Sequence, residues 1–334
     1  MASDKKLLLI CPRFFGYEKE IVKQAAISGW DVTFIDTRPA NSFFIKAMLR
    51  LGAEWIINRK IKKHHKYILS LLKKGNFSKA LFINPEGFRE SFFTETLHAA
   101  PKTERILYVW DSMLNKPLIK PLLGYFTKVY TFDREDAASF ENMHFLPLFY
   151  TERYALSKNY IEEGAFDKSY DMSFIGTVHS QRMAIVEKIS SDCIKLKLNF
   201  YRYLYIQSRI IFWFRKLTDI KYARYHIKDF NFVPLTQQQV TDIVMKSIAV
   251  LDIEHHKQKG LTMRTFEVLG SGRKLVTTNA DIINYDIYHP QNVLIIDRKE
   301  PVVNPEFFSS PFYQYPDNTI EKYSLSNWLK VLLS

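Results

Sequence analysis

Residues 258–279, QKGLTMRTFEVLGSGRKLVTTN, combine residue types and spacing that could bind an anionic ligand. The pattern predicts a turn at Gly260, a helix that begins near Thr262, and a buried strand after the helix. The N-terminus of a helix presents free N–H groups and the positive end of the helix dipole, so it can bind a diphosphate. Arg264 could add a bidentate contact to a phosphate, and Glu267 could accept hydrogen bonds from ribose hydroxyls. We therefore expect a nucleotide to bind here.

The same stretch resembles the donor-site segment of GT-B glycosyltransferases. The resemblance is in particular to the bacterial group of spore-maturation-protein-B-like enzymes and to many capsule and lipopolysaccharide transferases. In these enzymes a Phe-Glu-x-Leu-Gly-x-Gly helix start and the strand after it hold the nucleotide, and their Glu corresponds to Glu267. The resemblance covers residues 171–278 by motif and the N-terminal half by pattern alone. It implies a nucleotide-sugar donor and a glycan or lipid-linked acceptor of the bacterial surface.

Arg264 and Glu267 also fit a simpler interpretation, an ordinary exposed ion pair at i and i+3 on a helix. Gly260 and Thr262 precede the pair and two glycines follow it in the family's order, which favours donor binding. Many retaining members of the family carry a second Glu eight residues before the first, where this chain has Lys259. That departure removes the support for a retaining mechanism, so inversion and retention both stay open.

A second motif, residues 174–182 or FIGTVHSQR, predicts a strand that leads through a glycine loop into a helix. It resembles the first strand and loop of the C-terminal domain in the same family, where the loop borders the donor phosphates. An equally good interpretation is a helix capped by Ser180. The residues expected to contact the donor here are Gly176, Thr177, His179 and Arg182.

Acidic residues follow three of the expected N-terminal strands, and one of them could take the proton of an acceptor hydroxyl. Such side chains lie at the carboxyl ends of parallel strands, where open α/β sheets bind their ligands. Asp111, in YVWDS, is the first candidate for the catalytic base, and Glu86, in NPEGF, is the second. Asp133, in TFDRE, occupies a third such position. Each of the three could instead cap a following helix.

His255 and His256 stand close to Asp252 and Glu254, a composition that could suggest a metal site. Adjacent histidines point in different directions on a strand, and the spacing places no further ligand, so we expect neither a metal ion nor another cofactor. Without a metal, basic side chains and helix N-termini must neutralise the leaving diphosphate. The basic residues concentrated for this purpose are Lys257, Lys259 and Arg264.

The N-terminal half alternates short apolar runs with helical or loop stretches, which is typical of a parallel sheet flanked by helices. It opens with a strand, an amphipathic helix over residues 17–28 and a second strand. The basic stretch 59–74 predicts a helix with a solvated face. The expected strands are residues 6–11, 31–36, 80–84, 105–110 and 128–132.

The C-terminal half repeats this alternation after a polar, turn-rich stretch. The expected strands are residues 170–175, 194–200, 248–253, 274–278 and 292–297, and the expected helices are residues 181–190, 262–269 and 319–333. We therefore predict a GT-B architecture of two Rossmann-like doubly wound α/β domains that face each other across a cleft. The expected parts are an acceptor domain at 1–150, a linker at 151–169, a donor domain at 170–318, and a C-terminal helix at 319–334 that could cross back to the first domain.

The composition narrows the class of protein. The 334 residues suffice for two α/β domains, and a hydrophobic content of 47% suffices for packed cores. No apolar run approaches the roughly 20 residues of a membrane span, and the N-terminus lacks the pattern of a signal peptide. Cys11 and Cys193 are expected on strands of different domains, so a disulfide is not expected. We therefore expect a cytoplasmic protein.

The net charge of +12 predicts an anionic partner. The basic and aromatic stretch 195–228 could contact the anionic inner face of the cell membrane, although a long helix packed on the sheet explains it at least as well. No nucleic-acid-binding module is recognisable, so we expect no nucleic-acid partner, and a basic nucleic-acid-binding protein is the weakest alternative. The stronger alternative is a sugar-nucleotide epimerase, which uses the same two-domain fold without an acceptor.

Overall fold

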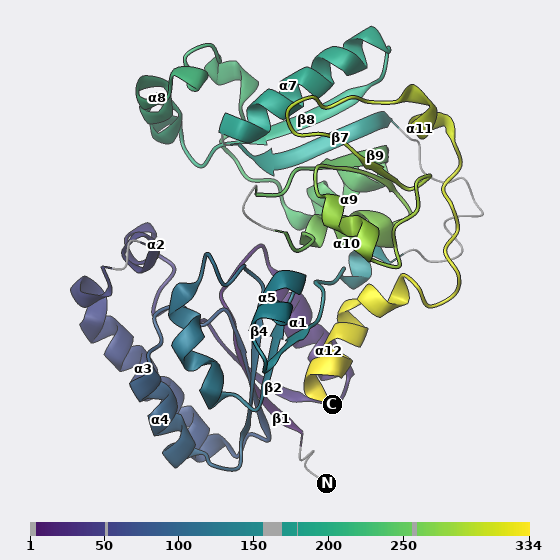
Figure 1. Cartoon of the computed structure of the whole chain (residues 1–334). Helices are drawn as coiled ribbons and strands as arrows, with labels where there is room; N and C mark the ends of the chain where they lie inside the picture. The colour runs from purple at the N-terminus through teal and green to yellow at the C-terminus, as the bar shows by residue number, and fades with distance from the viewer. Residues whose placement is uncertain (1–4, 51–52, 156–168, 179, 256–258) are drawn as a thin grey trace. The chain divides into compact units, whose positions relative to one another are not determined.

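The computed structural model of the chain describes residues 5–50, 53–155, 169–178, 180–255 and 259–334. The chain divides into two compact units, each built on a parallel sheet (Figure 1). Unit 1 comprises Met1–Leu148, Lys257–Gly260 and Leu325–Ser334. Unit 2 comprises Phe149–His256 and Leu261–Ser324.

Unit 1 holds a six-stranded sheet in which all neighbouring strands are parallel. The strand order is β2-β1-β3-β4-β5-β6, so the chain winds from β1 toward both edges. This is the doubly wound arrangement that the alternation of apolar runs and helices predicted. The strands are β1 (Lys6–Ile10), β2 (Asp31–Ile35), β3 (Lys79–Ile83), β4 (Glu104–Val109), β5 (Lys128–Thr131) and β6 (Met143–Phe145).

Helices cover both faces of this sheet. Leu8 and Ile10 of β1 pack on one face with side chains of α3 (Asn58–Gly75) and α4 (Glu90–Ala99). On the other face Tyr108 meets Trp328 of α12 (Leu325–Leu333) edge-on, with ring centroids 4.7 Å apart. The last helix of the chain therefore belongs to the core of unit 1, beside α1 (Tyr17–Ile27). The other helical segments are α2 (Phe43–Arg50), η1 (Glu54–Ile57), η2 (Pro117–Tyr125) and α5 (Arg134–Ser139).

Unit 2 holds a five-stranded parallel sheet in the order β11-β10-β9-β7-β8. The strands are β7 (Tyr170–Thr177), β8 (Phe200–Tyr205), β9 (Ser247–Asp252), β10 (Lys274–Thr277) and β11 (Val293–Ile295). The helices are α7 (Ser180–Lys195), α8 (Arg209–Thr218), α9 (Gln237–Met245), α10 (Met263–Gly270) and α11 (Pro305–Ser309). The short 3-10 segments are η3 (Glu152–Tyr154), η4 (Ile220–Tyr222), η5 (Ile227–Asp229), η6 (Ala280–Asn284) and η7 (Glu321–Tyr323).

The prediction of a strand at residues 194–200 is wrong. Helix α7 continues to Lys195 because Ile189 and Cys193 pack into the core of unit 2, and Cys193 therefore lies on a helix. The chain then turns at Lys197, which has a φ of 56°. The strand β8 begins only at Phe200.

Three further features of the elements also differ from the expectation. The strand expected to end at residue 175 continues to Thr177, because Gly176 and Thr177 pair with Leu204 and Tyr205 of β8, so Gly176 does not begin a loop. The stretch 195–228 is not one long helix but contains β8, α8 and two 3-10 segments. The C-terminal helix begins at Leu325, six residues later than expected. No helix in the described parts of the chain is both long and apolar enough to span a membrane.

Candidate functional site

The N-terminus of α10 is fixed to the carboxyl end of β9 by hydroxyl groups. Thr262 caps the helix, since its Oγ1 accepts the N–H of Thr265 at 3.4 Å. The same hydroxyl donates to Asp252 Oδ2 at 2.6 Å, and the Thr265 hydroxyl donates to that oxygen at 3.1 Å. Burial raises the pKa of Asp252, while the hydrogen bond from Thr262 acts in the opposite direction. The helix start predicted near Thr262 is confirmed.

Arg264 and Glu267 form an ion pair inside unit 2. Arg264 Nη1 lies 3.4 Å from Glu267 Oε2, and Glu267 is only 3% exposed. Burial raises the pKa of the nearby Tyr154 to about 12, and the negative charge of Glu267 adds to this shift. The i, i+3 ion pair of the simpler interpretation therefore exists. That interpretation is wrong in expecting the pair to be exposed, because Glu267 is buried. Arg264 is the more accessible member of the pair, with 22% of its side chain exposed.

Arg182 and Arg298 lie at the carboxyl ends of strands in the same sheet. Arg182 donates from Nε to the Ile253 carbonyl at 2.8 Å and from Nη1 to the Thr177 carbonyl at 3.2 Å. Arg298 donates to the Glu254 carbonyl at 2.7 Å and pairs with the Glu254 carboxylate. Burial lowers the pKa of Arg182, but a guanidinium stays protonated at neutral pH. Both heads are held in defined positions by backbone oxygens.

Arg298 is a basic residue that the sequence motifs do not select. Arg298 comes three residues after the end of β11. The rule that pointed to Asp111 and Glu86, that ligands bind beyond the carboxyl ends of parallel strands, could have identified this residue too. With Arg182 and Arg264 it gives this edge of unit 2 three guanidinium groups.

Lys259 and Gly260 contact the start of α5 in unit 1. Lys259 pairs with Glu135, and the Gly260 N–H donates to Asp133 Oδ2 at 3.3 Å. A Cβ at Gly260 would lie 2.6 Å from the ring of Phe132, so a larger residue would not fit without a shift. Asp133 also accepts the Glu135 N–H at 2.9 Å, which confirms it as the cap of α5. The donor-binding role of Lys259 and Gly260 stays a prediction.

The motif at 174–182 is ordered by contacts within unit 2. A Cβ at Gly176 would lie 2.8 Å from the ring of Phe174, so a larger residue there would require that ring to shift. Thr177 ends the strand and is exposed, and its carbonyl accepts from Arg182. His179, the other predicted donor ligand, lies outside the described residues. Arg182 is therefore the residue of this motif with the best defined geometry.

The two carboxylates considered for a metal site are engaged by protein donors. Asp252 accepts the two threonine hydroxyls of α10. Glu254 Oε2 accepts the Thr278 hydroxyl at 2.5 Å, and Glu254 Oε1 pairs with Arg298. Within the described ranges, no three His, Cys, Asp or Glu side chains are grouped so that they could hold a metal ion. His256 and Lys257 lie outside these ranges.

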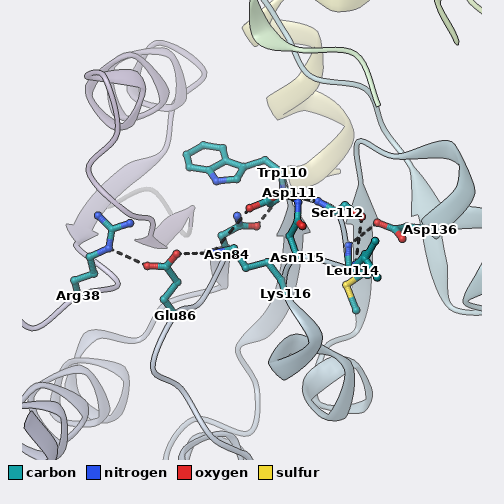
Figure 2. A network of polar contacts seen from close by, with 11 residues as sticks. Arg38, Asn84, Glu86, Trp110, Asp111, Ser112, Leu114, Asn115, Lys116 and Asp136 are labelled. Atoms are coloured by element: carbon teal, nitrogen blue, oxygen red, sulfur yellow. Dashed lines mark hydrogen bonds and ion pairs between the residues drawn. The ribbon is translucent and has the colours of Figure 1, made fainter. Parts of the chain in front are cut away.

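Figure 2 shows the polar network beyond the carboxyl ends of strands in unit 1. Glu86 accepts from Arg38 Nε at 3.0 Å and from Lys116 Nζ at 2.7 Å. Burial alone would raise the pKa of Glu86, but Lys116 and Arg38 hold that pKa below its ordinary value. A carboxylate with two cationic partners is a weak proton acceptor, so Glu86 is better suited to orient Lys116 than to act as the base.

Asp111 lies in the same network, with about a third of its side chain exposed. Its Oδ1 accepts the Ser112 N–H at 3.0 Å and the Asn115 side-chain amide at 3.1 Å. Its Oδ2 lies 3.9 Å from Lys116 Nζ. A turn rather than a helix follows Asp111, so the helix-capping interpretation is wrong for this residue. The structure thus joins both predicted acids, Glu86 and Asp111, through one lysine.

Aromatic side chains border this network. Trp110 donates its backbone N–H to Asn84 Oδ1 at 2.9 Å, which links the ends of β4 and β3. Phe14 and Phe15, in the loop after β1, are half exposed or more. The ring centroids of Phe14 and Trp110 lie 6.1 Å apart. Aromatic faces next to carboxylates suit the binding of sugars, whose C–H groups pack on rings while their hydroxyls accept and donate hydrogen bonds.

Solved structures match the chain over most of its length. OtsA, solved in the apo state, is 9% identical, with 99% of this chain and 98% of that chain covered and a TM-score of 0.62. An alpha-glucosyltransferase in complex with UDP and a 13-mer DNA is 12% identical, with coverages of 88% and 87% and a TM-score of 0.57. The UDP-GlcNAc 2-epimerase from Methanocaldococcus jannaschii is 8% identical, with coverages of 98% and 99% and a TM-score of 0.51.

These likenesses establish the fold. The two parallel-sheet units are the two α/β domains of a GT-B fold, as the sequence predicted. No protein-family model matches the sequence, and no curated protein matches it. At sequence identities of 8–12% the similarity shows the fold but not the activity, because proteins of one fold have many different activities.

Proposed function

We propose that this chain is a glycosyltransferase that moves a sugar from a nucleotide-sugar donor to a bacterial surface glycan without a metal ion. Unit 2 binds the donor and unit 1 binds the acceptor, a capsule, lipopolysaccharide or exopolysaccharide glycan that is free or lipid-linked. The GT-B fold supports this proposal, since one structure of that fold is an alpha-glucosyltransferase with bound UDP. The proposed location of the enzyme is the cytoplasm, at or near the inner face of the cell membrane.

The three guanidinium groups of unit 2 are the observation that carries the proposal. Arg182, Arg264 and Arg298 are each held by a carbonyl or carboxylate oxygen near the carboxyl edge of one sheet. The leaving group of a nucleotide sugar is a diphosphate, and its negative charge grows as the bond to the sugar breaks. Preorganised guanidinium groups and the N-terminus of α10 stabilise such charge without a metal.

Asp111 is the proposed base of unit 1. As the bond from the sugar to the diphosphate breaks, the acceptor oxygen forms the new bond to the sugar and its proton passes to Asp111. The diphosphate leaves with the bonding electron pair. Glu86 acts indirectly, because it holds Lys116, whose Nζ lies 3.9 Å from Asp111 Oδ2. Both inversion and retention remain compatible with these groups.

The proposal is tested by incubating the purified chain with a panel of nucleotide sugars and glycan acceptors, with and without a metal chelator. We expect one donor to yield a glycosylated acceptor and a free nucleoside diphosphate, at the same rate in the presence of chelator. Loss of activity with chelator, restored by a divalent ion, would contradict the metal-independent mechanism. Absence of transfer with every donor in the panel would count against the transferase itself.

The epimerase alternative is supported by one specific observation, the match to UDP-GlcNAc 2-epimerase over nearly the full length. The same assay without acceptor separates the two activities. A transferase leaves the donor sugar unchanged apart from slow hydrolysis. An epimerase converts the donor to a second nucleotide sugar of equal mass, which chromatography resolves.

A further inference from the structure

Helix α8 of unit 2 exposes a continuous apolar stripe. Ile210, Trp213, Phe214 and Leu217 follow the i, i+3, i+4, i+7 spacing that places side chains on one helix face. These four residues are 51% to 85% exposed, and Ile220 just after the helix is 88% exposed. Large apolar residues that gather on one exposed face mark an interaction surface more often than scattered single residues do.

The opposite face anchors α8 to unit 2. Phe212 is fully buried in the core of the unit. Arg215 donates to the Val178 carbonyl at 2.5 Å, and Lys216 Nζ donates to the Tyr225 carbonyl at 2.7 Å. Rotation of the helix to hide the stripe would break these contacts. In Figure 1 α8 lies at the margin of unit 2, beyond the edge strand β8.

The surroundings of the stripe are basic. Residues 209–229 contain six basic residues and two acidic residues, Asp219 and Asp229. Arg209, Arg224 and Lys228 are exposed, although Arg224 pairs with Glu187. An apolar helix face with flanking cations fits a surface of anionic lipid, because the apolar side chains enter the boundary of headgroups and acyl chains while the cations stay among the headgroups.

Unit 1 carries a basic surface of its own. Helix α3 contains no acidic residue, and Trp55 and Ile56 just before it are exposed. Taken by itself, this part of unit 1 has the same combination of exposed cations and exposed apolar side chains as α8. The exposed basic residues of α3 are Arg59, Lys60, Lys62, Lys63, Lys66, Lys73 and Lys74.

We propose that α8 docks this chain on an anionic membrane surface through Ile210, Trp213, Phe214 and Leu217. The inference rests on the proposed function for its purpose, since docking brings the enzyme to a lipid-linked acceptor. It does not depend on the donor site, and the two can therefore fail separately.

Flotation with lipid vesicles tests the docking. We expect the wild type to float with vesicles of phosphatidylcholine and phosphatidylglycerol, to stay behind with phosphatidylcholine alone, and to dissociate as salt rises. The pair Trp213→Ser and Phe214→Ser should weaken binding about tenfold or more, since two large apolar side chains no longer enter the lipid. The matched control is Ile283→Ser with Val302→Ser, two exposed apolar residues of the same unit, which should bind like the wild type.

A fluorophore on α8 locates the contact. Both native cysteines are buried, and burial raises the pKa of the Cys193 thiol to about 11, so an exposed introduced cysteine is labelled selectively. An environment-sensitive dye on Leu217→Cys should shift its emission to shorter wavelength when anionic vesicles are added. The same dye on Ile283→Cys should not respond.

Three results would overturn the docking proposal: unchanged vesicle binding in the Trp213 and Phe214 variant, a dye response at both positions, or no vesicle binding with a concentration-dependent dimer that the variant loses. The last result would assign the stripe to a second copy of the chain. Thermal unfolding at the wild-type temperature shows that the variant is folded. Nucleotide affinity, measured on the same samples, is expected to be unchanged, so a wild type that floats but binds no nucleotide contradicts only the proposed function.

Discussion

The Thr262 hydroxyl donates a hydrogen bond to Asp252 Oδ2 across 2.6 Å, and this contact fixes the first turn of α10 at the carboxyl end of β9. The same hydroxyl oxygen caps the helix by accepting the Thr265 N–H. One side chain thus serves both the end of a strand and the start of a helix. The N–H groups at this helix start, the proposed diphosphate ligands, are positioned by a buried carboxylate.

Replacement of the Thr262 hydroxyl should therefore destabilise unit 2. Thr262→Val keeps the shape of the side chain but leaves buried Asp252 with one donor fewer, at a cost of about 1–3 kcal/mol. Thr262→Ser keeps the hydroxyl and should recover most of this loss. Chemical denaturation of the three proteins measures the difference. Equal stability of the valine and serine variants would show that the contact to Asp252 contributes nothing.

The buried ion pair of Arg264 and Glu267 should be much more sensitive than a surface pair of the same spacing. Glu267→Ala removes a buried carboxylate that neutralises the partly buried guanidinium of Arg264, and it should cost about 3 kcal/mol. The matched control is Asp192→Ala, which removes the i, i+3 pair with Lys195 at the same distance of 3.4 Å. Lys195 is largely exposed, so this change should cost less than about 1 kcal/mol. Similar losses of unfolding free energy for both variants would contradict the burial argument.

Strongly apolar runs made most of the fold predictable from the sequence. The runs that became β1, β3, β4 and β9 are buried on both faces of their sheets, and each was located to within one or two residues. The errors fall where local pattern and tertiary contacts disagree. The run at 194–200 has the apolar content of a strand, but Cys193 and the residues before it complete the buried face of α7. The short strand β6 has only three residues and gave no periodic signal.

The sequence predicted where the residues of the candidate site lie, but not which side chains they contact. Residues at the carboxyl ends of strands, such as Glu86 and Asp111, were found because parallel strands align their ends. Their contacts through Lys116 depend on a side chain from a later turn, which spacing cannot reveal. Lys259 likewise pairs with Glu135, 124 positions away in the chain. Burial of Glu267 was also hidden, because a basic and an acidic residue at i and i+3 have the same pattern on an exposed or a buried helix face.

Asp111→Asn should slow transfer strongly and leave donor binding unchanged. The amide cannot accept the proton of the acceptor hydroxyl, so the turnover rate should fall by about 10²–10⁴-fold. Donor affinity should stay at the wild-type value, because the proposed donor contacts lie in unit 2. Steady-state kinetics and calorimetry on one preparation check both statements, with Asp192→Asn as a surface control. A fully active asparagine variant would exclude Asp111 as the base.

Glu86 should stabilise unit 1 only above acidic pH. Its folded-state pKa lies below its unfolded value because Lys116 and Arg38 outweigh the effect of burial. The stability it contributes is therefore present above the unfolded pKa of about 4.3 and is lost as pH falls through the folded pKa. The difference in unfolding free energy between wild type and Glu86→Gln should shrink between about pH 5 and about pH 3. A difference that does not change over this range would contradict the charged pairing.

The most direct test of the donor site is a calorimetric titration of the wild type, Arg264→Lys and Arg298→Lys with nucleoside diphosphates and the matching nucleosides. Lysine keeps a positive charge beside Glu267 and Glu254, so the fold should survive, but it cannot make bidentate contacts to phosphate. We expect one nucleoside diphosphate to bind the wild type, its nucleoside to bind far more weakly, and each lysine variant to lose about tenfold in affinity, while the control Arg224→Lys does not. Wild-type affinity in both variants, or no binding of any nucleoside diphosphate, would contradict a donor site at this edge of unit 2.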